Sequence, residues 1–327
     1  MASCFLTRPV MIKSKLSPDQ HITGISYGFA GMPPASPTNI AACYRNDLLT
    51  TYQGVPVILL SSTTLGSAQK YAKTGCKDTC GNVRIPFPFG IGANCSVNEW
   101  YNIDCKSSTP YLSSLHQLEV LGVGLENRTV TVKMQKFSNC SQKTKSVDLG
   151  SSPFLYSISH NTFVYEGYCG NAVMMDNNGS VLTGCSTTCI NDTTTTGIID
   201  TSNCFGINCC QTKIPQYLKS YSMKLTRLER QMSGDGACGS AYLLDKESDP
   251  EGSHLLSQST RDGTSYIPTS LQWILSYHDH EQVSCSGRWI SDVMDLGNGT
   301  LITSGICYTY GLSTMEGNPY LIDGYGT

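Results

Sequence analysis

The cysteines and the N-glycosylation sequons of this 327-residue chain share one segment, and this constrains the fold more than any other feature. Of 16 cysteines, only Cys4 and Cys43 precede residue 76, which leaves 14. Closely spaced cysteines in even number are typical of secreted proteins, because disulfides persist in oxidising compartments. We therefore expect these residues to form disulfides: Cys76, Cys80, Cys95, Cys105, Cys140, Cys169, Cys185, Cys189, Cys204, Cys209, Cys210, Cys238, Cys285 and Cys307.

The Asn-x-Ser/Thr sequons predict the same compartment. The sequence has them at Asn94, Asn127, Asn139, Asn178, Asn191 and Asn298. A sequon is used only where the glycosylation machinery reaches it, so the pattern predicts an extracellular glycoprotein. Asn94 and Asn139 are each followed by a cysteine. Early disulfide formation at those two sites would compete with glycan transfer.

The composition limits which fold classes and which classes of partner we expect. Charged residues make up 14% of the chain, against about a quarter in an average soluble protein. Residues 1–75 hold six Lys/Arg and two Asp/Glu (+4), residues 76–150 eight and six (+2), and residues 151–327 eight and 17 (−9). This Lys/Arg density is too low for a nucleic-acid partner. No apolar run reaches 18 residues, so we predict no transmembrane span.

The N-terminal region has a different character. Residues 55–60 are apolar and are followed by a polar spacer and small residues up to Ala68. This order is typical of the end of a secretory signal and predicts a mature chain that begins at Gln69. The block lies unusually far from Met1, and a short buried strand is the alternative. We treat residues 53–68 as a possible displaced signal segment and residues 1–52 as an unassigned leader.

Hydrophobic periodicity predicts a β-rich, disulfide-rich extracellular protein with little helix. Two-residue alternation or β-branched content predicts strands at 100–104, 118–121, 129–132, 154–156, 162–165, 217–225 and 271–275. Prolines at alternate positions predict an extended loop at 85–92. Cysteine-rich loops are expected at 185–189 and 204–210. In such a fold each disulfide contributes about 2–4 kcal/mol to stability.

Several motifs resemble one family. The Cys-x3-Cys-Gly-Asn-Val-x-Ile-Pro-Phe-Pro-Phe-Gly-Ile-Gly string of residues 76–92 resembles the opening of the galacturonan-binding domain of plant wall-associated receptor kinases. Cys95, Trp100 and Cys105 follow in that family's order. The Cys-Phe-Gly-Ile-Asn-Cys-Cys-Gln string of residues 204–211 is similar to the second cysteine-rich region of the same ectodomains.

The resemblance implies a division into domains. It places a galacturonan-binding-like domain at 76–140 and a second cysteine-rich domain at 141–306. Residues 317–321 resemble the start of an epidermal-growth-factor-like repeat, but Tyr325 stands where the family has a cysteine. We therefore expect residues 307–327 to form a truncated stub of that repeat.

The resemblance also implies a function. It implies non-catalytic binding of galacturonan, a pectic polysaccharide, in the plant cell wall or at the outer face of the plasma membrane, without a cofactor. The glycine-rich loop, strand lysine and His-Arg-Asp motif of a kinase are absent from the sequence. The alternative is a module that binds a peptide or a co-receptor through the acidic second region.

Galacturonan is a polyanion, so its binding needs cations, hydrogen-bond donors and flat apolar faces for sugar rings. The matching segment supplies Lys77, Arg84, Lys106, Phe87, Phe89, Trp100 and Tyr101 as candidate ligand-binding residues. Arg84 can hold a carboxylate through two parallel hydrogen bonds. The alternative is that the aromatic rings belong to the core and the cations are solvated surface groups.

Other chemistries are weakly indicated. Residues 24–28 match a nucleophile-elbow string without the strand-to-helix context that this motif requires. His278 and His280 are too few for a structural zinc site, so no metal is predicted. Cys209 and Cys210 could form a redox-active pair, but in a secreted chain two structural disulfides are expected.

Overall fold

The computed structural model describes residues 51–52, 55–56, 71–138, 144–167, 169–188, 204–207, 209–227, 239–248, 266–309 and 317–324. The chain divides into two units, Met1–Ser62 and Thr63–Thr327. In the first unit, β1 (Thr51–Tyr52) pairs with β2 (Val55–Pro56) in antiparallel fashion.

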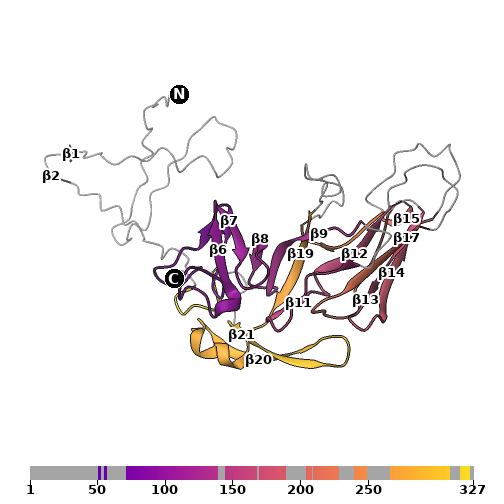
Figure 1. The fold of residues 1–327 in the computed structure, drawn as a ribbon. Helices are drawn as coiled ribbons and strands as arrows, with labels where there is room; N and C mark the ends of the chain where they lie inside the picture. The colour runs from indigo at the N-terminus through magenta and orange to yellow at the C-terminus, as the bar shows by residue number, and fades with distance from the viewer. Residues whose placement is uncertain are drawn as a thin grey trace, which may run out of the picture. The chain divides into compact units, whose positions relative to one another are not determined.

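The largest sheet has seven strands in the order β11-β19-β9-β8-β7-β6-β5 (Figure 1). Its members are β5 (Gly90–Ile91), β6 (Asn102–Lys106), β7 (Thr109–Leu112), β8 (Leu118–Gly124), β9 (Thr129–Gln135), β11 (Phe154–Tyr156) and β19 (Tyr266–Trp273). All neighbours are antiparallel except β5 and β6. The sheet therefore combines strands from both sides of residue 140.

Two four-stranded sheets pack against each other beside it. One has the order β10-β17-β13-β14 and the other β15-β16-β12-β18. The first contains β10 (Thr144–Lys145), β13 (Gly170–Met175), β14 (Val181–Ser186) and β17 (Ser222–Arg227). The second contains β12 (Asn161–Glu166), β15 (Phe205–Ile207), β16 (Cys209–Thr212) and β18 (Ser240–Asp245). Met174 of one sheet and Phe163 of the other belong to a single buried cluster, as in a sandwich.

Two hairpins and two short 3-10 helices complete the described unit. The hairpins are β3–β4 (Thr79–Cys80 and Val83–Arg84) and β20–β21 (Arg288–Asp295 and Leu301–Tyr308). The helices are η2 (Glu99–Tyr101) and η4 (Tyr277–Gln282). Asn98 caps the N-terminus of η2, because its side-chain oxygen accepts a hydrogen bond from the Trp100 N–H at 2.9 Å. The predicted β-rich class with little helix is confirmed.

Individual strand predictions have mixed outcomes. The segments at 118–121, 129–132, 154–156 and 162–165 lie within β8, β9, β11 and β12. The strand predicted at 100–104 begins only at Asn102, because η2 takes up Trp100 and Tyr101. The strand predicted at 217–225 begins at Ser222 and runs to Arg227.

Strand β19 also differs from its prediction, because it begins at Tyr266 and contains Pro268. Pro268 lies opposite Lys133 of β9, whereas β11 pairs only with the segment from Leu271 to Trp273. At Pro268, β19 therefore pairs with β9 along one edge and not with β11 along the other. A strand tolerates the missing N–H of proline at such an unpaired edge. The proline does not prevent the strand from forming.

All 11 cysteines among the described residues are disulfide-bonded. The pairs are Cys76–Cys95, Cys80–Cys105, Cys185–Cys210, Cys204–Cys209 and Cys285–Cys307. Cys169 is bonded as well. Cys140, Cys189 and Cys238 lie outside the described residues.

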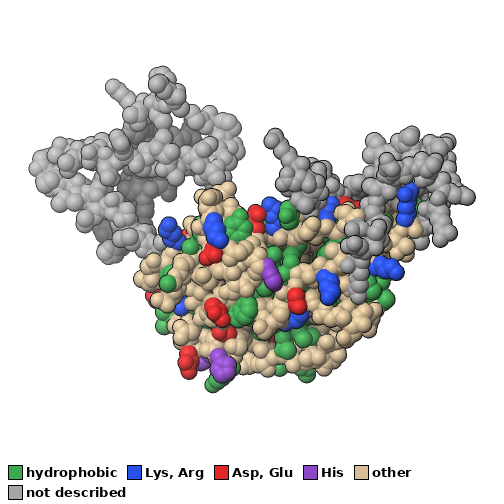
Figure 2. Space-filling model, viewed as in Figure 1, with side chains coloured by type: hydrophobic (Ala, Val, Ile, Leu, Met, Phe, Trp, Pro, Cys, Tyr) green, Lys and Arg blue, Asp and Glu red, His purple; other side chains and the backbone are tan. Residues whose placement is uncertain are grey.

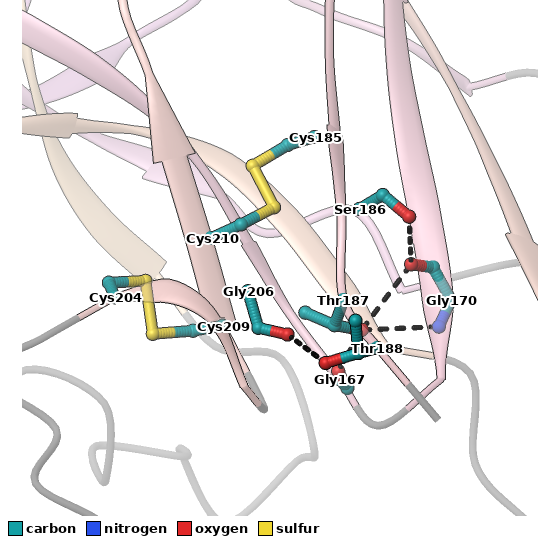
Figure 3. Close-up of a disulfide and its surroundings, with 10 residues drawn as sticks. All are labelled: Gly167, Gly170, Cys185, Ser186, Thr187, Thr188, Cys204, Gly206, Cys209 and Cys210. Atoms are coloured by element: carbon teal, nitrogen blue, oxygen red, sulfur yellow. Dashed lines mark hydrogen bonds between the residues drawn. A yellow bond between two sulfur atoms is a disulfide. The ribbon is translucent and has the colours of Figure 1, made fainter. Parts of the chain in front are cut away.

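The vicinal cysteines form two separate structural disulfides, as expected (Figure 3). The prediction that the segment around them is a loop is wrong, because Cys209 and Cys210 lie in β16 and Cys185 lies in β14. Next to them, the Thr187 hydroxyl donates to the Gly167 carbonyl at 2.7 Å, and the Thr188 hydroxyl donates to the Gly206 carbonyl at 2.8 Å. Cross-links and side-chain hydrogen bonds together fix this end of the sandwich.

Candidate functional site: a basic surface on the first cysteine-rich segment

The Ile-Pro-Phe-Pro-Phe segment lies in the interior. Phe87 and Phe89 are fully buried, and so is Tyr101. The Phe89 ring centroid lies 5.0 Å from that of Tyr101 and 6.1 Å from that of Trp273 in edge-on geometry, which is favourable for aromatic pairs. Backbone contacts also hold the segment, because the Phe87 N–H donates to the Tyr71 carbonyl at 2.7 Å.

The predicted ligand contacts of these aromatic residues are therefore corrected. Phe87, Phe89 and Tyr101 expose no ring face to solvent, because they form the core beneath the surface. The Tyr101 hydroxyl donates to the Ile274 carbonyl at 2.6 Å, and burial raises its pKa well above the usual value. Trp100 is half-buried against the same core. The three buried rings support the surface from below, and the ligand contact predicted for Trp100 stays a prediction.

Arg84 is an exposed cation that lies against an aromatic ring. It lies on β4 opposite Thr79, and its guanidinium carbon is 4.1 Å from the centroid of the Tyr71 ring. Among the described residues no ion pair includes Arg84. A guanidinium stacked on an aromatic face keeps its planar N–H edge free for a carboxylate. Tyr71 was missed by the sequence analysis, because it precedes the first cysteine of the motif.

Lys77 and Lys106 flank the same hairpin. Lys77 is exposed and has no ion pair among the described residues. Lys106 donates to the Gln117 side chain at 2.7 Å and lies 3.6 Å from the Asp104 carboxylate. That pair is largely exposed, so it contributes little to stability and can exchange for a ligand carboxylate.

Covalent and steric contacts connect these positions. The Cys80–Cys105 disulfide joins β3 to β6, one residue before Lys106. At the tip of the β3–β4 hairpin, Gly81 has a φ of +58°, and a Cβ there would lie 2.2 Å from the Ser108 carbonyl oxygen. Only glycine fits at that position. The tips of the β3–β4 and β6–β7 hairpins therefore lie against each other. Lys77, Arg84 and Lys106 lie on these hairpins or next to them.

We define the basic surface as Tyr71, Lys77, Arg84 and Lys106. Figure 2 shows Lys and Arg side chains at the β6–β7 end, beside Asp or Glu side chains, and others spread over the rest of this face. Surface charges on an ordered backbone attract a polyanion and lose little conformational entropy when they bind it. The arrangement contains cations and one stacked aromatic ring, which suits a carboxylated polymer.

Residues 76–134 match the family model described as wall-associated receptor kinase galacturonan-binding. The chain contains a wall-associated receptor kinase galacturonan-binding domain. The matched residues include Lys77, Arg84 and Lys106 of the basic surface. The family model describes a domain that binds a ligand. Tyr71 lies just before it.

Beyond the galacturonan-binding domain, the chain is homologous over much of its length to wall-associated receptor kinase-like proteins of Arabidopsis thaliana. It is 27% identical over 288 residues to wall-associated receptor kinase-like 5, which covers 77% of this chain and 38% of that protein. With wall-associated receptor kinase-like 4 it is 27% identical over 313 residues, covering 83% and 40%. The chain thus spans about two-fifths of the length of these relatives. No solved structure matches the chain.

The segment at 317–324 packs against the galacturonan-binding domain. Asn318 is buried, and its side-chain amide donates to the carbonyls of Tyr71 at 2.8 Å and Phe87 at 2.7 Å. Tyr320 packs edge-on against Trp273, with ring centroids 5.5 Å apart. The Asn-Pro-Tyr motif that resembles the start of a growth-factor-like repeat therefore completes the core beneath the basic surface.

Asp279 and His280 of the His-Asp-His motif at 278–280 have structural roles. Asp279 accepts hydrogen bonds from the Ser276 N–H at 2.7 Å and from the Asn98 amide at 2.8 Å, which joins η4 to the start of η2. His280 packs on Trp289, with ring centroids 4.9 Å apart. Within the described part of the chain, no helix has the length and apolar character needed to cross a membrane.

Proposed function

We propose that this protein binds galacturonan without catalysis, through the basic surface of its galacturonan-binding domain, in the extracellular space of a plant. The observation that carries the proposal is the exposed Arg84 guanidinium, stacked on Tyr71 within the family-matched segment and free of ion pairs in the described structure. A stacked guanidinium is already oriented, so less entropy is lost when it holds a uronate carboxylate.

The extracellular location is supported by the bonded state of the described cysteines. Four predicted sequon asparagines can be placed, and Asn94, Asn127, Asn178 and Asn298 are all exposed. We propose that the protein is a secreted glycoprotein of the cell wall or of the outer face of the plasma membrane. The structure does not describe the side chains of Asn139 and Asn191, which carry the other two sequons. It also does not describe the side chains of residues 53–68, where the signal is proposed.

The test is polygalacturonate binding by the parent protein and by Arg84→Ala. Loss of a charge-assisted hydrogen bond costs about 1.5–3 kcal/mol, so we expect binding about tenfold to a hundredfold weaker. Arg288→Ala is the matched control, because Arg288 is an exposed arginine at the start of β20. Binding should fall as salt rises, because exposed charges are screened.

A calcium chelator and a neutral galactan complete the design. Calcium could bridge pectin to acidic side chains, so binding that persists with the chelator assigns the contact to the cations. If correctly folded Arg84→Ala binds as tightly as the parent, with no salt dependence, the proposed site is wrong.

A second candidate function is peptide or co-receptor binding. It is favoured by exposed apolar side chains on the β20–β21 hairpin, where Val293 is 61% and Leu301 64% exposed. Single exposed apolar residues are common, so this observation is weaker than the one at Arg84. Failure to bind uronates in a polysaccharide array, with binding to a peptide array retained, would favour this function.

A further inference from the structure

The short segment that supports Arg84 carries a second cation. Arg84 lies over the Tyr71 ring, and two residues later the Lys73 ammonium lies 4.7 Å from the centroid of the Phe87 ring. The Tyr71 carbonyl accepts hydrogen bonds from the Phe87 N–H at 2.7 Å and from the Asn318 amide at 2.8 Å. The α-carbons of Tyr71 and Lys73 are at most about 7 Å apart. The backbone of Lys73 is therefore close to that of the residue that supports Arg84.

The Lys73 ammonium has N–H donors that are not used in hydrogen bonds to described residues. Its ammonium makes one long hydrogen bond, 3.4 Å, to the Ser96 carbonyl, whereas an ammonium has three N–H donors. Within the described residues no ion pair includes it. Partial burial lowers the pKa of this lysine, because desolvation disfavours the charged form. A carboxylate beside it would restore that lost solvation.

A cavity of about 410 Å³ opens beside Lys73. Its volume lies within the range of small-molecule sites, roughly 300–1,000 Å³. It lies between the 92–102 segment and η4, and most of the residues that line it have polar side chains. The lining residues are Lys73, Gly92, Ala93, Asn94, Ser96, Val97, Asn98, Glu99, Asn102, Ser114 and Gln282.

The cavity walls combine fixed and available polar groups. Asn98 donates to Asp279 at 2.8 Å, and Asn102 donates to Ser113 at 3.1 Å, so these amides are held in place. Asn94 and Gln282 make no side-chain hydrogen bond to another described residue. Their amides can therefore bind hydroxyl groups. The Glu99 carboxylate on the same wall favours hydroxyl donors there and repels a second carboxylate.

We propose that this cavity binds one uronate residue, with its carboxylate on Lys73 and its hydroxyls toward the free amides, as an extension of the basic surface. The proposal rests on the proposed galacturonan-binding function but makes a separate claim. It predicts that a single galacturonate binds, whereas the basic surface alone requires only a polymer. Asn94 is also a sequon residue, and a glycan on its amide would compete with the ligand, so the test uses protein without N-glycans.

The test uses the full chain secreted into a bacterial periplasm, where disulfides form and N-glycans are not added. Acetylation of each lysine is followed by mass spectrometry with and without galacturonate, galactose or acetate at about 10 mM. A ligand of this size binds with a Kd of about 1 mM at ordinary ligand efficiency. We expect galacturonate to slow Lys73 acetylation several-fold and to leave exposed Lys224 unchanged.

The same measurement separates the outcomes. Equal protection by galactose or acetate, or no protection by galacturonate, would overturn the cavity proposal even if polygalacturonate binds the parent protein. Protection of Lys73 without any polygalacturonate binding would support the cavity and reject the polymer function.

A variant gives the second measurement. Lys73→Gln should weaken trigalacturonate binding by about tenfold, as expected for the loss of a hydrogen bond to a charged group. Lys224→Gln should leave it unchanged. Equal affinity of Lys73→Gln and the parent would contradict the proposal. If Lys73→Gln does not fold, the acetylation result on the parent protein decides.

Discussion

The core beneath the basic surface and the β20–β21 hairpin are stabilised in different ways. In the core, the rings of Phe89, Tyr101, Phe154, Trp273 and Tyr320 form one cluster, and each is fully or almost fully buried. They come from four distant parts of the chain. The surface that they support therefore depends on the whole unit and not on residues 76–134 alone.

The hairpin buries far less. No residue of β20 is buried, and in β21 only Ser304, Gly305 and Cys307 are. Its contacts to the rest of the unit include the Arg128–Asp292 ion pair at 3.1 Å, a hydrogen bond from Arg128 to the Ser304 hydroxyl at 3.1 Å, and one from the Gly305 N–H to the Leu275 carbonyl at 2.7 Å. The Cys285–Cys307 disulfide closes the base of the hairpin. Figure 1 shows the hairpin as a long ribbon along one side of the larger sheets. Where few residues of a region are buried, disulfides and other specific bonds stabilise it instead.

The largest expected effect follows from removing a ring of the core. Trp273→Ala should lower the free energy of unfolding by about 3–5 kcal/mol, because it leaves a cavity among packed rings. Denaturant unfolding measures the loss. Trp289→Ala on the hairpin is the control and should cost less than half as much, because Trp289 is only partly buried. Equal losses at both sites would remove the contrast between the regions.

The hairpin should respond strongly to loss of its cross-link. The Cys285→Ser/Cys307→Ser double variant opens a loop with a sequence separation of 22 residues. A loop of this size corresponds to a loss of about 3 kcal/mol. Hydrogen exchange should show faster exchange in β20 and β21, with the amides of Phe87 and Phe89 still protected. Faster exchange throughout the core would mean that the two regions unfold together.

A smaller effect is expected at the contact between the two hairpin strands. A Cβ on Gly305 would lie 1.8 Å from the Trp289 ring, whereas a Cβ on Gly122 of β8 would meet nothing within 4 Å. Gly305→Ala should therefore cost about 1–3 kcal/mol. Gly122→Ala should change stability by less than about 1 kcal/mol in either direction. If Gly305→Ala leaves the free energy of unfolding unchanged, the Trp289 ring moves freely.

The smallest expected effect is at the exposed face of the hairpin. Val293→Thr, at a residue that is 61% exposed, should change the free energy of unfolding by less than about 0.5 kcal/mol. Val132→Thr is the matched change at a fully buried strand position and should cost about 1–3 kcal/mol, because it buries a hydroxyl. A large loss from Val293→Thr in dilute protein would indicate that this face is covered.

Local patterns in the sequence predicted much of the fold. Alternation found the positions of β8 and β9, because one face of each strand packs on the core and the period of two survives in the sequence. Cysteine parity predicted that the vicinal Cys209 and Cys210 would form two structural disulfides. Prolines correctly excluded a helix at 85–92. The pairing of the cysteines could not be predicted, because it depends on which strands become neighbours.

The candidate site was predicted in part. Arg84, Lys77 and Lys106 are exposed, as the motif and their charge indicated, since ionised side chains remain in solvent unless they are paired. The same reasoning placed Phe87, Phe89 and Tyr101 at the ligand, where the structure has them in the core. An aromatic ring suits a sugar face and a core equally well. Its neighbours decide between the two, and here they come from residues 154, 273 and 320.

By itself, the sequence predicted the disulfide bonding, the β-rich class, the family resemblance and the exposed positions of Lys77, Arg84 and Lys106, because each of these depends on residue type and local spacing. Only the tertiary structure showed that Tyr71 stacks on Arg84, that Asn318 closes the core, and that Lys73 borders a polar cavity. Those contacts join residues as far apart as 247 positions. Long-range proximity arises from packing, which no local pattern records.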